Sequence, residues 1–228
     1  MSGMRVALDG PGSSGKSSVG AAAALQLGFR FLDTGIVYRA ITLAAVMRGL
    51  DPTDGEALVA VVPEIEVVAD EAGAIRHVKL AGRDVTDHIH VPEVDQNVSA
   101  VSAQPRVRAA LLDLQRDIAA GGSIILAGRD IGTVVLPDAD LKLFLEVSVE
   151  ERARRRAAER GIPVDSRQAE QILADLRRRD HLDGSRLVAP MRVPDDAVIV
   201  HADGNTFEQS VAAVVDVIRE RAAQGTGA

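Results

Sequence analysis

The chain of 228 residues contains no cysteine, which excludes disulfide bonds and thiolate metal sites. Nothing in the composition points to an oxidising compartment, and a cytoplasmic location fits it best. The sequence also has no apolar run approaching the length of a membrane span, and its opening residues lack the basic and then apolar pattern of a leader. We therefore expect a protein that is not attached to a membrane.

Basic residues are fewer than acidic residues, at 26 against 33. The formal net charge is −7, whereas binding to nucleic acid or to an acidic membrane needs a broad basic field. We expect no nucleic-acid partner, while small charged ligands remain open. Only three of the 26 basic residues are lysines, so arginine supplies nearly every positive charge.

One of those lysines belongs to a glycine-rich motif near the amino terminus. The residues from Gly10 to Ser17, GPGSSGKS, match the pattern G-x-x-x-x-G-K-[ST] at every fixed position. A strand-like stretch (4–9) precedes the motif and an alanine-rich, helix-like stretch (18–27) follows it. We therefore expect a loop that binds the phosphates of ATP, made of Gly10, Pro11, Gly12, Ser13, Ser14, Gly15, Lys16, Ser17 and Ser18.

Two residue types in this motif have specific chemical tasks. Lys16 would reach the β- and γ-phosphates, and the hydroxyl of Ser17 would hold Mg²⁺, the expected cofactor that accompanies ATP. A guanine-reading N/T-K-x-D segment is absent, because Lys79 and Lys142 lie in mostly apolar stretches. The sequence therefore disfavours a small GTPase.

The hydrophobic pattern predicts an α/β protein in which strands alternate with helices, with a central, mostly parallel sheet flanked by helices. The expected strands are 4–9, 29–33, 65–69, 75–80, 123–127, 141–145 and 197–200, with a further possible strand at 85–89. The expected helices are 18–27, 36–48, 56–62, 91–101, 105–120, 149–160, 166–181 and 206–222. We expect one domain over 1–228 with a small β-rich insert.

Arginines next to small polar residues suggest clamps for a second, anionic substrate. They occur in the segments 33–39, 104–108 and 128–133. Arg39 alone would also suit a solvent-exposed helix face, and Arg129 with Asp130 would also suit a local ion pair. The position of that pair, directly after a buried strand, favours a ligand site. The charged run 150–156 fits either a solvated helix face with pairs such as Glu151–Arg155 or a mobile flap.

These segments, together with Arg179–Asp180, Asp183, Arg186 and 188–190, resemble the bacterial cytidylate kinases, in the family's order and over nearly the whole chain. The resemblance implies a P-loop kinase with a nucleoside monophosphate (NMP) binding insert at about 60–103 and an arginine-rich lid at about 151–166. It also implies an enzyme of pyrimidine metabolism that transfers the γ-phosphoryl group of MgATP to CMP and dCMP. ATP, CMP and dCMP would be its partners, and we expect a monomer.

The resemblance further implies roles for individual residues. Ser99, Arg108 and Asp130 would read the cytosine edge, Arg39 and Arg129 would hold the acceptor phosphate, and Arg179 with Asp183 would meet the ribose. Thr34 and Tyr38 would complete the CMP site, and Lys16, Arg129, Arg155 and Arg186 would be catalytic. Ala127 stands where many relatives carry an acidic residue, so this chain has no carboxylate at that position to take part in the Mg²⁺ or water shell.

Two other functions remain open from the residues alone. A kinase of the same architecture could act on UMP, shikimate or a similar anion. A module that senses a nucleotide without transferring phosphate would carry the same glycine-rich loop. Ser99, Arg108 and Asp130 argue against a kinase with another acceptor, because their donors and acceptors suit cytosine. ATP binding without ADP formation from any monophosphate would support the sensing module.

Overall fold

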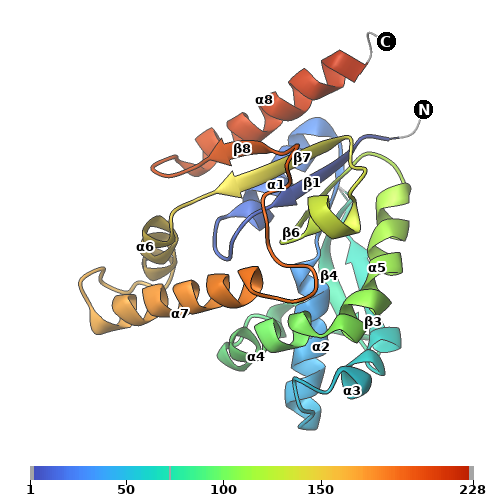
Figure 1. The fold of residues 1–228 in the computed structure, drawn as a ribbon, viewed down its shortest axis with the longest axis vertical. Helices are drawn as coiled ribbons and strands as arrows, with labels where there is room; N and C mark the ends of the chain where they lie inside the picture. The colour runs from blue at the N-terminus through green and yellow to red at the C-terminus, as the bar shows by residue number, and fades with distance from the viewer. Residues whose placement is uncertain (1–2, 72, 226–228) are drawn as a thin grey trace.

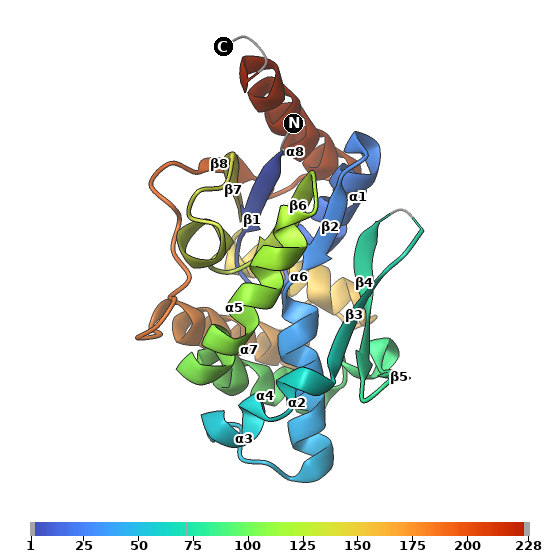
Figure 2. The ribbon, with the colours of Figure 1, turned by 90° about the vertical axis from the view of Figure 1, so that its right-hand side faces the viewer.

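The computed structural model describes residues 3–71 and 73–225. Within these residues eight strands form one sheet (Figures 1 and 2). Their bounds are Arg5–Asp9 (β1), Arg30–Asp33 (β2), Ile65–Ala69 (β3), Ala74–Leu80 (β4), Arg83–Asp84 (β5), Ile124–Gly128 (β6), Leu141–Glu146 (β7) and Val198–His201 (β8). The order is β3-β4-β2-β6-β1-β7-β8, with β5 paired to β4. All pairs are parallel except β3–β4 and β4–β5, which confirms the expected mostly parallel α/β sheet.

Helices cover both faces of the sheet. Their bounds are Lys16–Leu27 (α1), Gly35–Arg48 (α2), Gly55–Val59 (α3), Pro92–Ala103 (α4), Pro105–Ala120 (α5), Val149–Glu159 (α6), Arg167–Gly184 (α7) and Phe207–Gly225 (α8). Helices α1 and α8 pack on one face, and α2, α4 and α5 contribute to the core on the other. Of the helices within the described residues, none combines the length and the apolar character that a bilayer crossing requires.

The alternation of side chains along β1 explains why two cores form. Ala7 belongs to the core beneath α2, α4 and α5, whereas Val6 and Leu8 belong to the core beneath α1 and α8. All three side chains are fully buried. A strand buried on both faces must be apolar at every position, which is why β1 reads as a continuous apolar run.

The β-rich insert extends the main sheet. The hairpin of β3 and β4 joins it through a parallel pairing between β4 and β2, in which Phe31 lies opposite Ala74. The prediction of a further strand at 85–89 is wrong, because β5 ends at Asp84. The carboxylate of Asp84 accepts a hydrogen bond from the N–H of Thr86 at 2.9 Å, and this turn leads into a short 3₁₀ helix over Thr86–His88.

Helices α6 and α7 form a helical hairpin beyond the end of the sheet (Figure 1). Their own apolar cluster, made of Ala153, Ala157, Ile172 and Leu176, holds them together. The side chain of Ser148 caps α6 by accepting a hydrogen bond from the N–H of Glu151. Residues 151–166, predicted as the lid, form most of α6 and the connection to α7, and α7 lies against α4.

Candidate functional site

The site forms where the parallel strands end at one edge of the sheet. Strand β1 lies between β6 and β7, and β2 is the next neighbour of β6. Their carboxyl ends bring together the glycine-rich loop after Asp9, the segment beginning at Asp33, and the Arg129–Asp130 segment. Open α/β sheets bind ligands at this edge.

The glycine-rich loop has the tight geometry that phosphate binding requires. Gly15 adopts a left-handed backbone with φ 87° directly before α1, a conformation that glycine adopts without steric cost. A Cβ atom on Gly12 would lie 3.2 Å from Nη2 of Arg129, so glycine also permits the close approach of that arginine. The loop therefore presents its backbone, with a guanidinium beside it, to an anion at the start of α1.

Lys16 lies buried at the base of this loop. Its Nζ donates a hydrogen bond to the carbonyl oxygen of Pro11 at 3.0 Å. Burial, reinforced by the nearby positive charge of Arg129, holds the pKa of Lys16 well below its usual value. An anionic ligand would relieve this unfavourable environment, because it would supply the negative charge that the buried ammonium lacks.

Ser17 and Asp33 supply oxygen ligands of the kind that Mg²⁺ prefers. The Ser17 hydroxyl donates a hydrogen bond to the Asp33 carboxylate, which also accepts the N–H of Gly35 at 2.8 Å. Asp33 lies opposite Ala127 in the β2–β6 register, so the neighbouring strand supplies a carboxylate beside the position where Ala127 has none. No cluster of three or more His, Cys, Asp or Glu side chains suited to a metal ion occurs within residues 3–71 and 73–225. A pair of oxygens fits Mg²⁺ that is shared with nucleotide phosphates.

Two arginines of α6 contact the glycine-rich loop. Arg152 donates to the carbonyl oxygen of Gly12 at 3.0 Å and pairs with Asp180 of α7 at 2.5 Å. Arg156 donates from Nη1 to the hydroxyl of Ser13 at 2.9 Å. The helical hairpin is therefore attached by two guanidinium groups to the glycine-rich loop (10–18), which we call the donor loop.

Arg155, predicted as catalytic, does not lie at this loop. Its guanidinium pairs with Glu151 one turn earlier at 2.7 Å and donates to the carbonyl oxygen of Ala202 at 2.5 Å. Successive residues on a helix point about 100° apart, so Arg155 and Arg156 cannot both face the loop. The sequence predicts this Glu151–Arg155 pair as the feature of a solvated helix face, the alternative to a flap for the charged run 150–156. The structure brings Arg156, not Arg155, to the donor loop.

A second pocket, which we call the acceptor pocket, lies beside the donor loop. It contains eight of the nine residues predicted to bind CMP, and Arg186 joins them. Ser99 alone is displaced: it lines the adjoining cavity between α4 and α7. The residues of the acceptor pocket are Asp33, Thr34, Gly35, Tyr38, Arg39, Val98, Ser102, Arg108, Gly128, Arg129, Asp130, Arg179, Asp183 and Arg186.

Buried ion pairs organise the acceptor pocket. Arg108 pairs with Asp130, and its guanidinium lies 5.6 Å from the centre of the Tyr38 ring. Asp183 accepts hydrogen bonds from both Arg129, at 2.9 Å, and Arg186. Burial alone would raise the pKa of Asp183, but the surrounding arginines hold it below its usual value. The Asp183 carboxylate is therefore ionised and fixes Arg129 and Arg186 in place.

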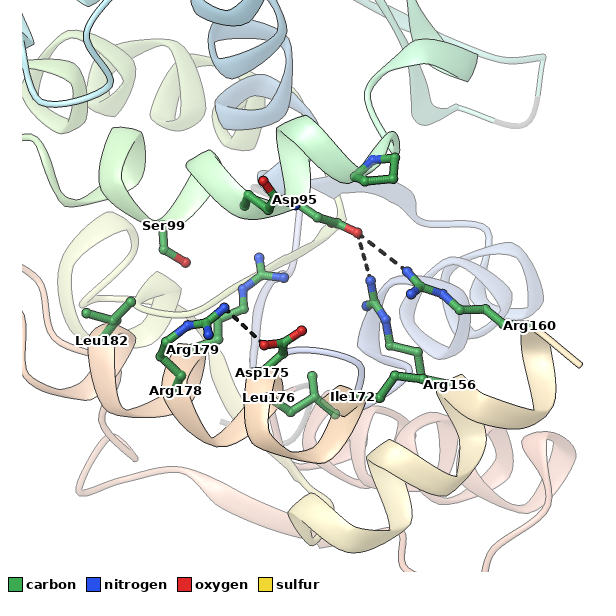
Figure 3. Close-up of a pocket in the computed structure, with 12 residues that line it drawn as sticks. Asp95, Ser99, Arg156, Arg160, Ile172, Asp175, Leu176, Arg178, Arg179 and Leu182 are labelled. Carbon is green, nitrogen blue, oxygen red and sulfur yellow. Dashed lines mark hydrogen bonds and ion pairs between the residues drawn. The ribbon is translucent and has the colours of Figure 1, made fainter. Parts of the chain in front are cut away.

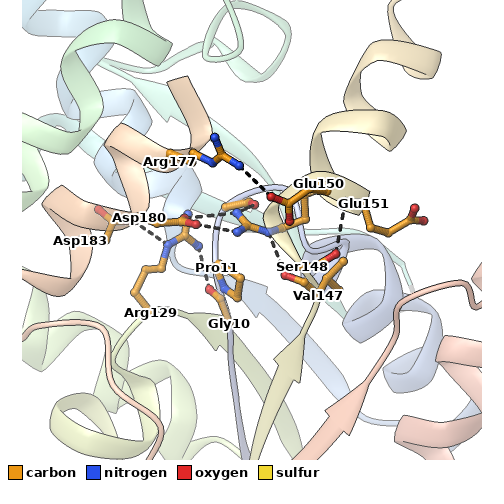
Figure 4. A network of polar contacts seen from close by, with 12 residues as sticks. Gly10, Pro11, Arg129, Val147, Ser148, Glu150, Glu151, Arg177, Asp180 and Asp183 are labelled. Carbon is orange, nitrogen blue, oxygen red and sulfur yellow. Dashed lines mark hydrogen bonds and ion pairs between the residues drawn. The ribbon is translucent and has the colours of Figure 1, made fainter. Parts of the chain in front are cut away.

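Arg129 connects the donor loop with the acceptor pocket. Its Nε donates to Asp183, and its Nη1 donates to the carbonyl oxygen of Gly10 at 3.3 Å (Figure 4). Arg179 lies alongside, with its buried Nε lacking a hydrogen-bond partner among the described residues. Burial and the charge of Arg129 lower the pKa of Arg179 to about 10. Two cationic side chains therefore lie where the glycine-rich loop meets the second pocket.

Several polar residues of the site were not predicted. Ser102, one turn after Ser99, accepts a hydrogen bond from Arg186 at 2.9 Å, and helical spacing alone would have put it on the same side of α4. Asp9 lies buried under the Arg129–Asp130 segment, and Asp95 pairs with arginines of α2 and α6. No sequence signal distinguishes Asp9 or Asp95 from other acidic residues.

Fold and site together define a P-loop kinase: a glycine-rich phosphate loop after the central strand, a lysine at its base, and an arginine-rich second pocket beside it. Residues 6–220 match the family model described as cytidylate kinase. The chain therefore belongs to the cytidylate kinase family, as the resemblance in the sequence implied.

Individual relatives agree with this assignment. The chain is 45% identical over 217 residues to the cytidylate kinase of Mycobacterium leprae, covering 95% of this chain and 96% of the relative. It is 40% identical over 225 residues to that of Shouchella clausii, covering 97% and 99%. Among solved structures, an uncharacterized protein from Eubacterium ventriosum aligns with a TM-score of 0.52 at 10% identity, over 95% of this chain and 98% of that one, and shares the fold alone.

Proposed function

We propose that this protein transfers the γ-phosphoryl group of MgATP to CMP and dCMP, giving ADP with CDP or dCDP, by direct in-line attack. One observation carries the proposal: Arg129 contacts the donor loop at Gly10 and the acceptor pocket at Asp183. A guanidinium in that position can neutralise charge on both substrates at once. Membership of the cytidylate kinase family supports the choice of acceptor.

The donor half is the glycine-rich loop from Gly10 to Ser18. Lys16 supplies a cation at its base, and Arg152 and Arg156 reach the loop from α6. The oxygens of Ser17 and Asp33 would hold Mg²⁺, which would supply positive charge for the phosphates of ATP. Closure of the lid, at about 151–166, would exclude water, which would otherwise hydrolyse ATP.

The acceptor half binds each part of the monophosphate with a different group. We assign the acceptor phosphate to Arg39 and Arg129, the ribose to Asp183 with Arg179, and the transferring phosphate to Arg186. The phosphate oxygen of CMP is already anionic near neutral pH, so its attack needs no protein base. Positioning and charge neutralisation by these arginines then do most of the catalytic work.

The cytosine base would be read by the Arg108–Asp130 pair, with Ser99 at the edge of the site. A carboxylate accepts a hydrogen bond from the amino group of cytosine, and a guanidinium donates to its ring nitrogen and carbonyl oxygen. Uracil presents a carbonyl where cytosine presents the amino group, so Asp130 would repel it. This pocket therefore favours cytosine over uracil.

A coupled assay of ADP formation tests the proposal, with ATP in excess and CMP, dCMP, UMP, AMP and GMP as acceptors. We expect kcat/KM to be highest for CMP and dCMP, lower for UMP, and negligible for the purines. A preference for a purine or for UMP would overturn the choice of acceptor. ATP binding without transfer to any monophosphate would indicate a sensing module. A monomeric state and a cytoplasmic location remain predictions from the sequence.

A further inference from the structure

Asp95 on α4 is the meeting point of three arginines. Its Oδ1 pairs with Nη2 of Arg39 at 2.7 Å, and its Oδ2 pairs with Nη2 of Arg156 at 2.8 Å and of Arg160 at 3.6 Å. Figure 3 shows Arg156 of α6 and Arg160, which directly follows this helix, converging on the Asp95 carboxylate. The Asp95 side chain is 20% exposed, so the group is partly shielded from water.

The arginines that Asp95 joins belong to opposite ends of the proposed reaction. Arg39 lines the acceptor pocket and also donates to the carbonyl oxygen of Ile89 at 2.9 Å. Arg156 contacts Ser13 of the donor loop through its other terminal nitrogen. One carboxylate thus bridges an arginine assigned to the acceptor phosphate and an arginine at the donor loop. Asp95 has the same sign of charge as both substrates, so it cannot bind their phosphates itself.

The space around Asp95 supports a role in substrate entry. The cavity that it lines has a volume of about 340 Å³, whereas the adjoining acceptor pocket has about 60 Å³, and Arg179 lines both. Ligand pockets in proteins commonly measure about 300–1,000 Å³, so a nucleotide needs the larger cavity, a widened acceptor pocket, or both. A monophosphate that enters through the larger cavity meets Arg39 and Arg156 already engaged with Asp95.

We propose that Asp95 is a positioning residue that competes with the acceptor phosphate for Arg39 and Arg156, so that substrate binding exchanges a carboxylate for a phosphate on these two arginines. The inference rests on the proposed function, in which Arg39 holds the acceptor phosphate. A monophosphate carries between one and two negative charges near neutral pH and a carboxylate carries one, so the exchange favours the substrate. Asp95 keeps the arginines ordered, and it weakens nucleotide binding enough to speed product release.

The variant Asp95→Asn tests the competition, because it removes the charge and keeps the size of the side chain. We expect the Kd of CMP, measured by calorimetry without ATP, and the KM of CMP to fall by roughly tenfold, the equivalent of about 1.4 kcal/mol. We expect kcat to stay the same or to fall. A Kd that rises or does not change would overturn the proposal, because a residue that merely supports the pocket would weaken binding when altered.

A ligand without phosphate separates this role from a general change in the pocket. We expect the inhibition constant of cytidine against CMP to be equal in the wild type and in Asp95→Asn. Equal tightening of cytidine and CMP would contradict the exchange of carboxylate for phosphate. The amide of Asp95→Asn can form new hydrogen bonds, so Asp95→Ser, which has no amide, is a second variant. We expect the same fall in the Kd of CMP for Asp95→Ser.

Asp175→Asn is the matched control. Asp175 lines the same cavity but pairs with Arg178 at 3.1 Å and accepts from Gln171 at 2.9 Å, with no contact to Arg39 or Arg156. We expect its Kd for CMP to match the wild type, and a fall equal to that of Asp95→Asn would reduce the effect to overall charge and overturn the proposal. Turnover of CMP by the wild type is measured first: its absence would defeat the proposed function, whereas turnover without tighter binding in Asp95→Asn would defeat the inference alone.

Discussion

The carboxylate of Asp9 accepts a hydrogen bond from the backbone N–H of Ile131 at 2.8 Å, and its second oxygen accepts the N–H of Gly132, also at 2.8 Å. Asp9 ends β1 directly before the donor loop, and Ile131 opens a π-helical turn directly after Asp130. A single fully buried side chain therefore fixes the segment that carries Arg129 and Asp130 relative to the phosphate loop.

The buried position of Asp9 makes stability depend on pH. Burial raises the pKa of Asp9 to about 6, although the hydrogen bonds from the N–H groups of Gly132 and Ile131 act in the opposite direction. The folded state thus binds the proton more tightly than the unfolded state, so the contribution of Asp9 is complete below about pH 4 and is lost as the pH rises through 6. We expect the free energy of unfolding of the wild type, relative to Asp9→Asn, to fall between pH 4 and 6 by about 1.4 kcal/mol for each unit of pKa difference.

Urea denaturation of both proteins across this pH range measures the difference, and Asp138→Asn serves as an exposed control. We expect the control to follow the wild type within about 0.5 kcal/mol. A difference between wild type and Asp9→Asn that stays constant would show that the pKa of Asp9 is the same in the folded and unfolded states, and one that grows with pH would show that folding lowers it; either result would contradict the raised pKa.

Replacement of Lys16 separates catalysis from folding. We expect Lys16→Ala to reduce kcat by about 100-fold or more, because a cation at the transferring phosphate is lost. Its melting temperature should not fall, since burial already disfavours the Lys16 charge in the folded state. Normal turnover in this variant would refute the assignment of the phosphate loop, and circular dichroism checks the fold.

Substitution of Arg156 should lower kcat/KM for ATP much more than substitution of its neighbour Arg155. Arg156→Ala removes the contact with Ser13, and we expect kcat/KM for ATP to fall roughly 10- to 100-fold, as for the loss of a charged hydrogen bond of about 1.5–3 kcal/mol. Arg155→Ala removes a contact with Glu151, and we expect less than about 1 kcal/mol of stability to be lost with kcat/KM for ATP retained. Steady-state kinetics with ATP as the varied substrate measure both effects. A larger fall in kcat/KM for ATP in Arg155→Ala than in Arg156→Ala would support the sequence prediction that Arg155 is catalytic.

Asp130 should set the choice between pyrimidines. In Asp130→Asn the amide can donate to the carbonyl of uracil, so we expect the ratio of kcat/KM for CMP to that for UMP to fall by roughly tenfold or more. The change also leaves Arg108 buried without its anionic partner, so the variant should lose about 3–5 kcal/mol of stability and is best assayed well below its melting temperature. An unchanged ratio in a folded variant would remove Asp130 from base recognition.

Asp33 should govern the requirement for Mg²⁺. We expect Asp33→Asn to need a higher Mg²⁺ concentration for half-maximal activity at fixed ATP, because an amide oxygen is a weaker ligand than a carboxylate. Titration of activity with Mg²⁺ gives the midpoint, and Asp51→Asn, a change in a distant exposed turn, is the control. Equal midpoints for Asp33→Asn and the wild type would exclude Asp33 from the metal shell.

The sequence predicted much of this structure because its strongest signals are local. The GPGSSGKS motif, the apolar strands and the helix expected at 105–120 depend on neighbouring residues, and the structure has the corresponding elements. The parallel sheet followed from strands alternating with helices. The pairing of β4 with β2 did not, because register across a sheet depends on residues far apart in the chain.

The site was harder to predict because side-chain direction decides it. Arg155 and Arg156 are equivalent in composition, and only the rotation of α6 about its axis selects Arg156 for the donor loop. Ser99 and Ser102 share one side of α4, but they lie one turn apart along it and line different cavities. Asp9 and Asp95 act through partners more than fifty positions away, a relationship that no local pattern contains.

The central claim is that the donor loop and the acceptor pocket, joined by Arg129, form one site for direct transfer to a cytidine monophosphate. Phosphorus-31 NMR of the purified protein with MgATP and CMP tests it most directly, since it follows substrates and products together. We expect ATP and CMP to disappear and ADP and CDP to appear in equal amounts. Formation of ADP and inorganic phosphate with CMP unchanged would contradict the claim.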